Sequence, residues 1–134
     1  MKFIAQIVAS LLGSILVGIA GLAYGVTLGG NLGFPSFGGY TAGYEAAGVF
    51  FSIIGISTGS LLGIVVAKNL QNKSQKNLAA AIITAVIMAI IGVNLAYYYM
   101  PTAISLTILL TPTAVLIPIT NWQNLFQKKA NETK

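Results

Sequence analysis

The sequence contains no cysteine, histidine, aspartate or arginine, and only two acidic residues stand against seven lysines. Without cysteine there are no disulfides and no thiolate ligands. Without histidine, the usual general base and the usual haem and zinc ligands are missing. Two isolated glutamates do not supply the paired carboxylates of acid–base chemistry. We therefore predict that the protein is not an enzyme and holds no metal or cofactor through a side-chain ligand; contact with lipid or pigment would need no such ligand.

Charge as a whole is scarce, because only 7% of the 134 residues are charged while 56% are hydrophobic. Soluble domains carry about 25% charged residues, and disordered chains combine low hydrophobicity with high charge. The composition excludes both classes. It predicts an integral membrane protein.

Four apolar runs have the length that a bilayer-spanning helix needs, which is about 20 residues. They cover residues 3–28, 45–67, 78–100 and 102–120, and a short basic tail follows at 121–134. The runs are continuously apolar, whereas membrane β-strands alternate apolar and polar residues. We predict an all-α protein with one transmembrane domain over 1–134, a four-helix bundle whose last helix is interrupted by Pro112 and Pro118.

The lysines predict how this bundle is oriented. Lys2 precedes the first run, Lys68 and two neighbours lie between the second and third, and the remaining three follow the fourth. In a four-span model all seven fall on one side, which the positive-inside rule assigns to the cytoplasm. Both termini are then cytoplasmic, and 27–44 is an outer loop. We expect an inner membrane of a prokaryote or a thylakoid membrane.

Small residues form stripes along three of the predicted helices. Because lipid provides little hydrophobic drive between helices, such stripes permit the close backbone approach that holds membrane helices together. The simplest interpretation is packing within one bundle, as in a glycine zipper; a glycine-lined pore or a self-association face are the alternatives. The predicted packing residues are Gly18, Gly21 and Gly25, then Gly55, Gly59 and Gly63, and finally Ala85 and Ala89.

The predicted outer loop at 27–44 holds six of the fifteen glycines and is rich in aromatic residues. Aromatic side chains suit the membrane interface and are also enriched where proteins meet. One interpretation is a loop with interfacial anchors. The other is a docking surface for a subunit, lipid, quinone or pigment, with Phe34, Phe37 and Tyr40 as the contacting residues.

Two polar residues are candidates for roles inside or beside the membrane. Asn94 lies in the third predicted helix, opposite its alanine stripe, and we expect it to be buried against another helix or a partner. Glu45 lies where the second helix begins, where a carboxylate stabilises the helix dipole. An outer cation site is the alternative for Glu45.

These features favour a non-catalytic subunit with an accessory, structural or assembly role in a larger membrane complex, such as an energy-converting one. The expected partners are membrane lipid and other membrane subunits. The basic tail is too sparse to predict nucleic-acid binding. The alternative function is a small homo-oligomeric channel or carrier for a neutral or weakly charged solute.

Overall fold

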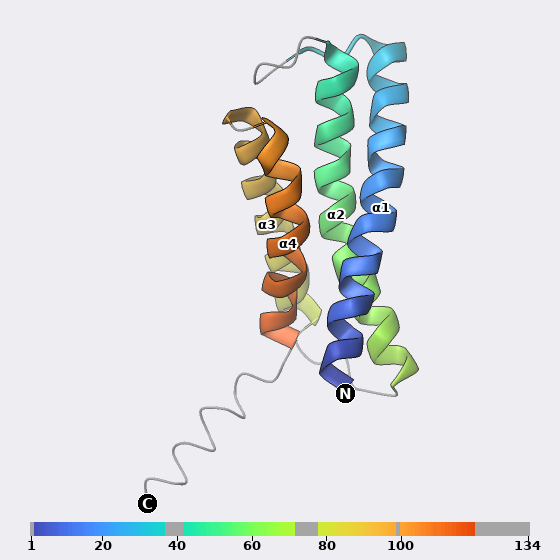
Figure 1. Ribbon diagram of the computed structural model, residues 1–134, viewed down its shortest axis with the longest axis vertical. Helices are drawn as coiled ribbons and strands as arrows, with labels where there is room; N and C mark the ends of the chain where they lie inside the picture. Colours follow the sequence, from blue (N-terminus) through green and yellow to red (C-terminus); the bar gives the residue numbers. More distant parts are fainter. Residues whose placement is uncertain (1, 37–41, 72–77, 99, 120–134) are drawn as a thin grey trace, which may run out of the picture.

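The computed structural model describes residues 2–36, 42–71, 78–98 and 100–119. These segments form helices α1 (Lys2–Leu32), α2 (Gly43–Leu70), α3 (Leu78–Tyr98) and α4 (Met100–Ile119), with no strand among them. The helices run alternately up and down, so that α1 begins and α4 ends at the same end of the bundle (Figure 1). The expectation of an all-helical protein is confirmed for the described part of the chain.

Three of these helices are long and apolar enough to cross a membrane, namely α1, α2 and α3. In α4 the corresponding apolar stretch is shorter, Ile104–Pro118, and contains both prolines. The structure therefore fits an integral membrane protein. That α4 also crosses the bilayer, and that both termini are cytoplasmic, stay predictions.

The first helix is longer than the sequence predicted, because it continues to Leu32 instead of ending near residue 28. Gly29 is buried against α2, where an added Cβ would lie 2.7 Å from Tyr44 Cα. This tertiary contact compensates for the low helix propensity of glycine. The helix then stops at Gly33, which has a φ of 65°, and the Phe34 N–H donates to the Gly29 carbonyl at 3.3 Å. That combination is a Schellman cap, so the first third of the expected loop is helical.

The first two helices meet along a ladder of contacts in which backbone lies against backbone. At Gly13, Gly21, Gly25, Gly55, Gly59 and Gly63, an added Cβ would lie no more than 3.0 Å from backbone carbonyl atoms of the other helix. Each step of four residues up α1 is matched by a step of four residues down α2. The six facing pairs are Ala9 with Gly63, Gly13 with Gly59, Val17 with Gly55, Gly21 with Phe51, Gly25 with Ala47, and Gly29 with Gly43.

Polar side chains join this helix pair near the end where α1 begins and α2 ends. The Ser10 and Ser60 hydroxyl oxygens lie 2.7 Å apart, and Ser10 Oγ also donates to the Ser60 carbonyl at 3.2 Å. Beside them, Gln6 Nε2 donates to Gln71 Oε1 at 3.3 Å. Hydrogen bonds between membrane helices contribute about 0.6 kcal/mol each on average. The pair is thus held by dispersion along its length and by hydrogen bonds at one end.

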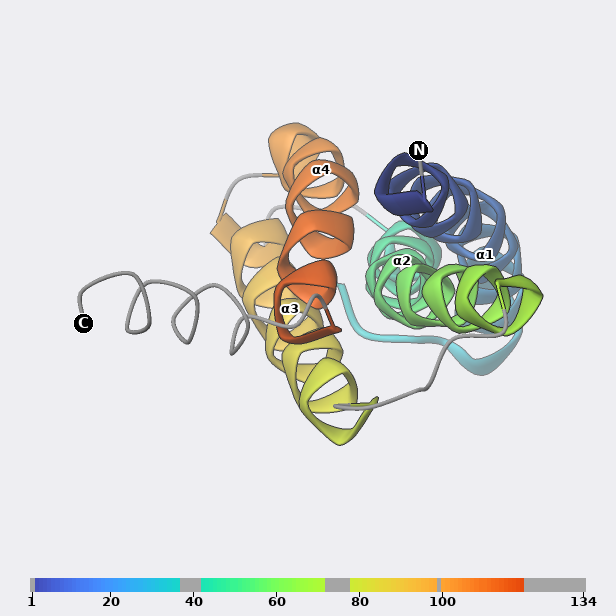
Figure 2. The same cartoon turned by 90° about the horizontal axis from the view of Figure 1, so that it is seen from below.

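The second helix is the centre of the bundle, with α1 on one side and the pair α3 and α4 on the other (Figure 2). Two small cores join α2 to the second pair. One contains Ile64, Ala81, Ala85, Val115 and Leu116, and the other contains Val49, Ile53 and Ala96. Contacts between α2 and α3 are nevertheless sparse beside those between α1 and α2. The molecule is a tight helical hairpin with a looser one beside it.

The two hairpins also differ in height. With 31 and 28 residues, α1 and α2 are about 46 and 42 Å long, whereas the 21 and 20 residues of α3 and α4 give about 31 and 30 Å. The hydrocarbon core of a bilayer is about 30 Å thick. In Figure 1 the longer pair reaches past the shorter one at the end where α1 leads into α2.

Candidate functional site

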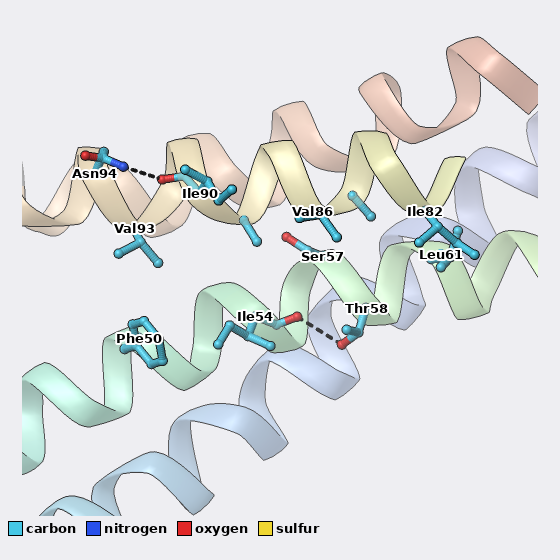
Figure 3. Close-up of a pocket in the computed structure, with 12 residues that line it drawn as sticks. Phe50, Ile54, Ser57, Thr58, Leu61, Ile82, Val86, Ile90, Val93 and Asn94 are labelled. Atoms are coloured by element: carbon cyan, nitrogen blue, oxygen red, sulfur yellow. Dashed lines mark hydrogen bonds between the residues drawn. The ribbon is translucent and has the colours of Figure 1, made fainter. Parts of the chain in front are cut away.

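A groove of about 410 Å³ lies between α2 and α3 (Figure 3). Its volume falls within the usual range for ligand sites, about 300–1,000 Å³. Apolar side chains provide almost all of its surface. The lining comprises Phe50, Ile54, Ser57, Thr58 and Leu61 from α2, and Ile82, Ala85, Val86, Ala89, Ile90, Val93 and Asn94 from α3.

The groove exists because α3 touches α2 chiefly through small residues placed toward its two ends. Near one end, Ala96 is buried against Ile53, and Gly92 brings α3 so close that an added Cβ would lie 2.8 Å from Ile53 Cγ2. Near the other end, Ala81 and Ala85 are buried beside Ile64. Between these contacts no large side chain fills the flank of the interface, and the space stays open.

Ser57 is the unusual residue of this groove. It is only 2% exposed, and its hydroxyl has no hydrogen-bond partner among the described residues. Figure 3 shows its oxygen pointing from α2 toward α3. An unsatisfied buried hydroxyl costs about 1–3 kcal/mol. The Ser57 hydroxyl, in the middle of the groove, would therefore gain from a hydrogen-bond partner.

Other hydroxyls of the bundle donate to a carbonyl of their own helix, which Ser57 does not. Thr58 Oγ1 donates to the Ile54 carbonyl at 2.9 Å, and Ser14 Oγ donates to the Ser10 carbonyl at 2.9 Å. Such bonds to the preceding helical turn are the common way to satisfy a hydroxyl in a membrane helix. Ser57 points across the interface toward α3 instead, and its oxygen is covered there, so a molecule in the groove would meet it only if α2 and α3 moved slightly apart.

Asn94 stands at one end of the groove, on a side of α3 that no other described helix covers. The side chain is exposed on the chain and not buried between helices, and Nδ2 donates to the Ile90 carbonyl of its own helix at 2.8 Å (Figure 3). Among the described residues it forms no hydrogen bond to another helix, and contact with a partner stays a prediction. The amide satisfies part of its polarity locally, as asparagine does when no neighbour is in reach.

The chemistry available in the groove is that of binding. Its described lining contains no charged residue, and no group of three acidic residues that could hold a metal ion exists among the described residues. A hydroxyl without an adjacent base is not an activated nucleophile. What the groove offers is apolar contact along its walls and one buried hydrogen-bonding group.

Comparisons with protein-family models, curated proteins and solved structures find no match to this chain.

The residues expected to pack helices are distributed over two interfaces. Gly21, Gly25, Gly55, Gly59 and Gly63 all lie against backbone at the α1/α2 contact, and Gly18 faces the side chain of Ile56, whose Cγ1 would be 2.8 Å from an added Cβ. In α3, Ala85 is buried in the core with Ile64, while Ala89 is half-buried and lines the groove.

A chain of aromatic rings occupies the raised end of the α1/α2 pair. Phe34 packs on Phe50 with ring centroids 6.4 Å apart, Phe50 meets Phe51 at 5.6 Å, and Phe51 meets Tyr24 at 5.7 Å. Phe34 thus contacts its own chain and is half-buried there. The other two predicted docking residues, Phe37 and Tyr40, lie outside the described residues.

Glu45 lies in the first turn of α2, as the sequence predicted, and is half-buried. This first turn is where a carboxylate interacts favourably with the helix dipole. The position therefore suits the electrostatic role considered from the sequence.

The sequence analysis missed two residues: Ser57, which lines the groove, and Gly13, which packs α1 against α2. Gly13 belongs to the ladder that repeats every four residues, and it faces Gly59 directly. Counting in steps of four from Gly25 and Gly21 would have reached it. Ser57 had a weaker signal, because Thr58 also lies between Ile54 and Leu61 on the groove side of α2 and the sequence does not tell which hydroxyl lacks a partner.

Proposed function

We propose that the protein is a non-catalytic integral membrane protein that serves as an accessory, structural or assembly subunit of a larger membrane complex. The observation that carries the proposal is the raised aromatic end of the α1/α2 pair. A rigid hairpin longer than the bilayer core presents rings at a height that a neighbouring subunit can reach. Tyrosine is enriched at the cores of protein interfaces.

Several tyrosines at this end are exposed on the isolated chain. Tyr24 is 60% exposed at the edge of the ring cluster, and Tyr44 is 47% exposed at the start of α2. Tyr97 and Tyr98 end α3 at the same end of the bundle and are exposed as well. A second subunit that covered these rings would bury large apolar areas and still satisfy the hydroxyls at the membrane surface.

In the proposed orientation, the end that holds the last turn of α2 and Lys68 faces the cytoplasm. The host membrane is then a prokaryotic inner membrane or a thylakoid membrane, with lipid and other subunits as partners. A reporter fused after Gln71 is expected to be active on the cytoplasmic side, and one fused after Tyr98 on the opposite side. Activity of both fusions on one side would contradict this orientation.

Affinity purification from native membranes tests the proposed function. The tagged chain should co-purify with larger subunits in fixed proportion. Tyr44→Ala combined with Tyr98→Ala should weaken that association, because both rings are exposed at the same end of the bundle, Tyr44 on α2 and Tyr98 on α3. Leu62→Ala is the control, since Leu62 is 54% exposed in the half of α2 that lies away from that end. Equal recovery of subunits from all variants would show that the exposed tyrosines do not contribute to the association.

One observation favours the alternative, a small homo-oligomeric channel or carrier for a neutral or weakly charged solute. A second cavity, of about 250 Å³, lies among α1, α2 and α4, and its otherwise apolar wall includes Ser14 and Ser52. Buried hydroxyls are the kind of group that guides an uncharged polar solute. A homogeneous homo-oligomer that conducts a solute in liposomes, with no other subunit bound, would decide for this function.

A further inference from the structure

The depth of Ser57 restricts what can reach its hydroxyl. Ser57 is fourteen residues from Gly43 and thirteen from Leu70, which places it about 20 Å from either end of α2. This helix is long and apolar enough to span a membrane. The hydroxyl therefore lies near the middle of the hydrocarbon, where water is absent and no lipid headgroup reaches.

The walls of the groove restrict the occupant further. Above and below Ser57 they consist of apolar side chains, among them Phe50, Leu61 and Val86. An ion or a strongly polar metabolite would leave its polar groups unpaired there, at high cost. A phospholipid could place an acyl chain in the groove, but its ester oxygens stay near the membrane surface, about 15 Å from the middle of a 30 Å core.

We propose that the groove between α2 and α3 binds a membrane-dissolved lipophilic carbonyl compound, a long-chain ketone or quinone, whose oxygen accepts a hydrogen bond from the Ser57 hydroxyl. The carbonyl oxygen satisfies the buried donor of the groove, which has no partner among the described residues. The apolar remainder of the ligand fills the space beside Ala89 and Val86. This binding is independent of the proposed role as a subunit, since a free chain in a bilayer would show it.

A photoreactive carbonyl probe tests the proposal directly. The full chain is reconstituted into phospholipid nanodiscs with 4-hexylbenzophenone, whose carbonyl both accepts the hydrogen bond and cross-links on illumination. An alkyl diazirine without oxygen is the matched probe. Labelled residues are located by peptide mass spectrometry. We expect the benzophenone to label residues near Ser57, such as Ile54 and Val86, in preference to the lipid-exposed face of α1.

Three variants separate hydrogen bonding from shape. Ser57→Ala should lower benzophenone labelling of the groove by roughly two- to tenfold, the range that loss of one neutral hydrogen bond gives, and leave diazirine labelling unchanged. Ala89→Phe should lower labelling by both probes because the new ring fills the groove. Thr84→Ala is the control, since that hydroxyl donates to the Ala80 carbonyl of its own helix at 2.9 Å.

Four results would overturn the proposal. Equal benzophenone labelling of Ser57→Ala and the native chain would show that the hydroxyl holds no carbonyl. A fall with both probes in Ser57→Ala would show that the hydroxyl only shapes the groove. Labelling spread evenly over the lipid-exposed faces would show that the probe samples the bilayer without binding. Protection of the groove from both probes, together with a dimer in native mass spectrometry, would show that a second copy covers it.

Discussion

The backbone contact between Gly13 and Gly59 makes a sharp prediction for the change Gly59→Ala. The added methyl would lie 2.7 Å from the Gly13 carbonyl carbon and 2.8 Å from Val17 Cβ. Overpacking costs about 1–3 kcal/mol, and the upper end applies because the obstacle is mainly backbone, which cannot rotate away. Alanine returns about 1 kcal/mol through its higher helix propensity. The expected net loss of stability is about 2 kcal/mol, or roughly thirtyfold in the unfolding equilibrium.

Gly30→Ala is the matched control for this change. Gly30 also lies inside a helix, but an added Cβ there meets nothing within 4 Å. Only the propensity term remains, so this variant should be more stable than the native chain by about 1 kcal/mol. The same substitution thus has opposite signs at two helical glycines of one protein.

The double change Gly13→Ala with Gly59→Ala tests the contact itself. The first methyl already forces α1 and α2 apart, so the second should cost less than it does alone, and the two losses should not add up. Gly30→Ala with Gly59→Ala should be additive within about 0.5 kcal/mol.

Separation of α1 from α2 is the quantity to measure. The chain has no cysteine, so dyes can be attached at Ile4→Cys and Leu70→Cys, which replace side chains that are 62% and 82% exposed. Energy transfer between the dyes then follows unfolding in mixed micelles as the fraction of denaturing detergent rises. Native-like stability of Gly59→Ala, or strict additivity with Gly13→Ala, would refute the backbone contact.

Further changes follow from the same contacts, with the same assay as the measurement. Gly21→Ala, which meets a backbone carbonyl of α2, should destabilise more than Gly18→Ala, which meets a flexible side chain; the reverse order would contradict the ladder. Thr111→Val should stabilise the chain by about 1–3 kcal/mol, because the Thr111 hydroxyl is fully buried and has no partner in the part of the chain that the structure describes. Thr113→Val, at an exposed position, should stay near neutral. Ser10→Ala should cost about 0.6 kcal/mol through loss of its bond to α2, and no change would make that bond irrelevant.

The helices themselves were predictable from the sequence because their signals are long and local. The first three apolar runs exceed the length at which a buried segment and a membrane span can be confused, whereas α4 is shorter. The end of α1 was not predicted, because two opposing tendencies meet there. Glycine-rich sequence argues for a loop, whereas burial of Gly29 against α2 stabilises further helical turns. Gly33 carried the stop signal, but a glycine-rich sequence does not tell which of its glycines adopts the left-handed conformation that ends the helix.

The groove was beyond the reach of sequence analysis for a different reason. An alanine stripe predicts close approach, and Ala81, Ala85 and Ala96 do lie buried. Ala89 belongs to the same stripe, yet it borders open space, because contact at the two ends of an interface does not require contact in its middle. Asn94 shows the same limit: helical periodicity placed it opposite the stripe, but only the arrangement of neighbouring helices decides whether that side is covered.

Contacts that repeat every four residues along both α1 and α2 have a drawback, because a repeat can slip. If one helix slid by one repeat, Gly13 would face Gly63 or Gly55, and the backbones could still approach closely at that level. Dispersion along small residues distinguishes such pairings weakly. The Ser10 hydroxyl does not share this tolerance, since a slip by four residues would move it from Ser60 to Ile56 or Ile64 and leave it unpaired in hydrocarbon. The Ser10–Ser60 hydroxyl pair thus sets the register of the two helices, whereas the glycines allow them to pack closely.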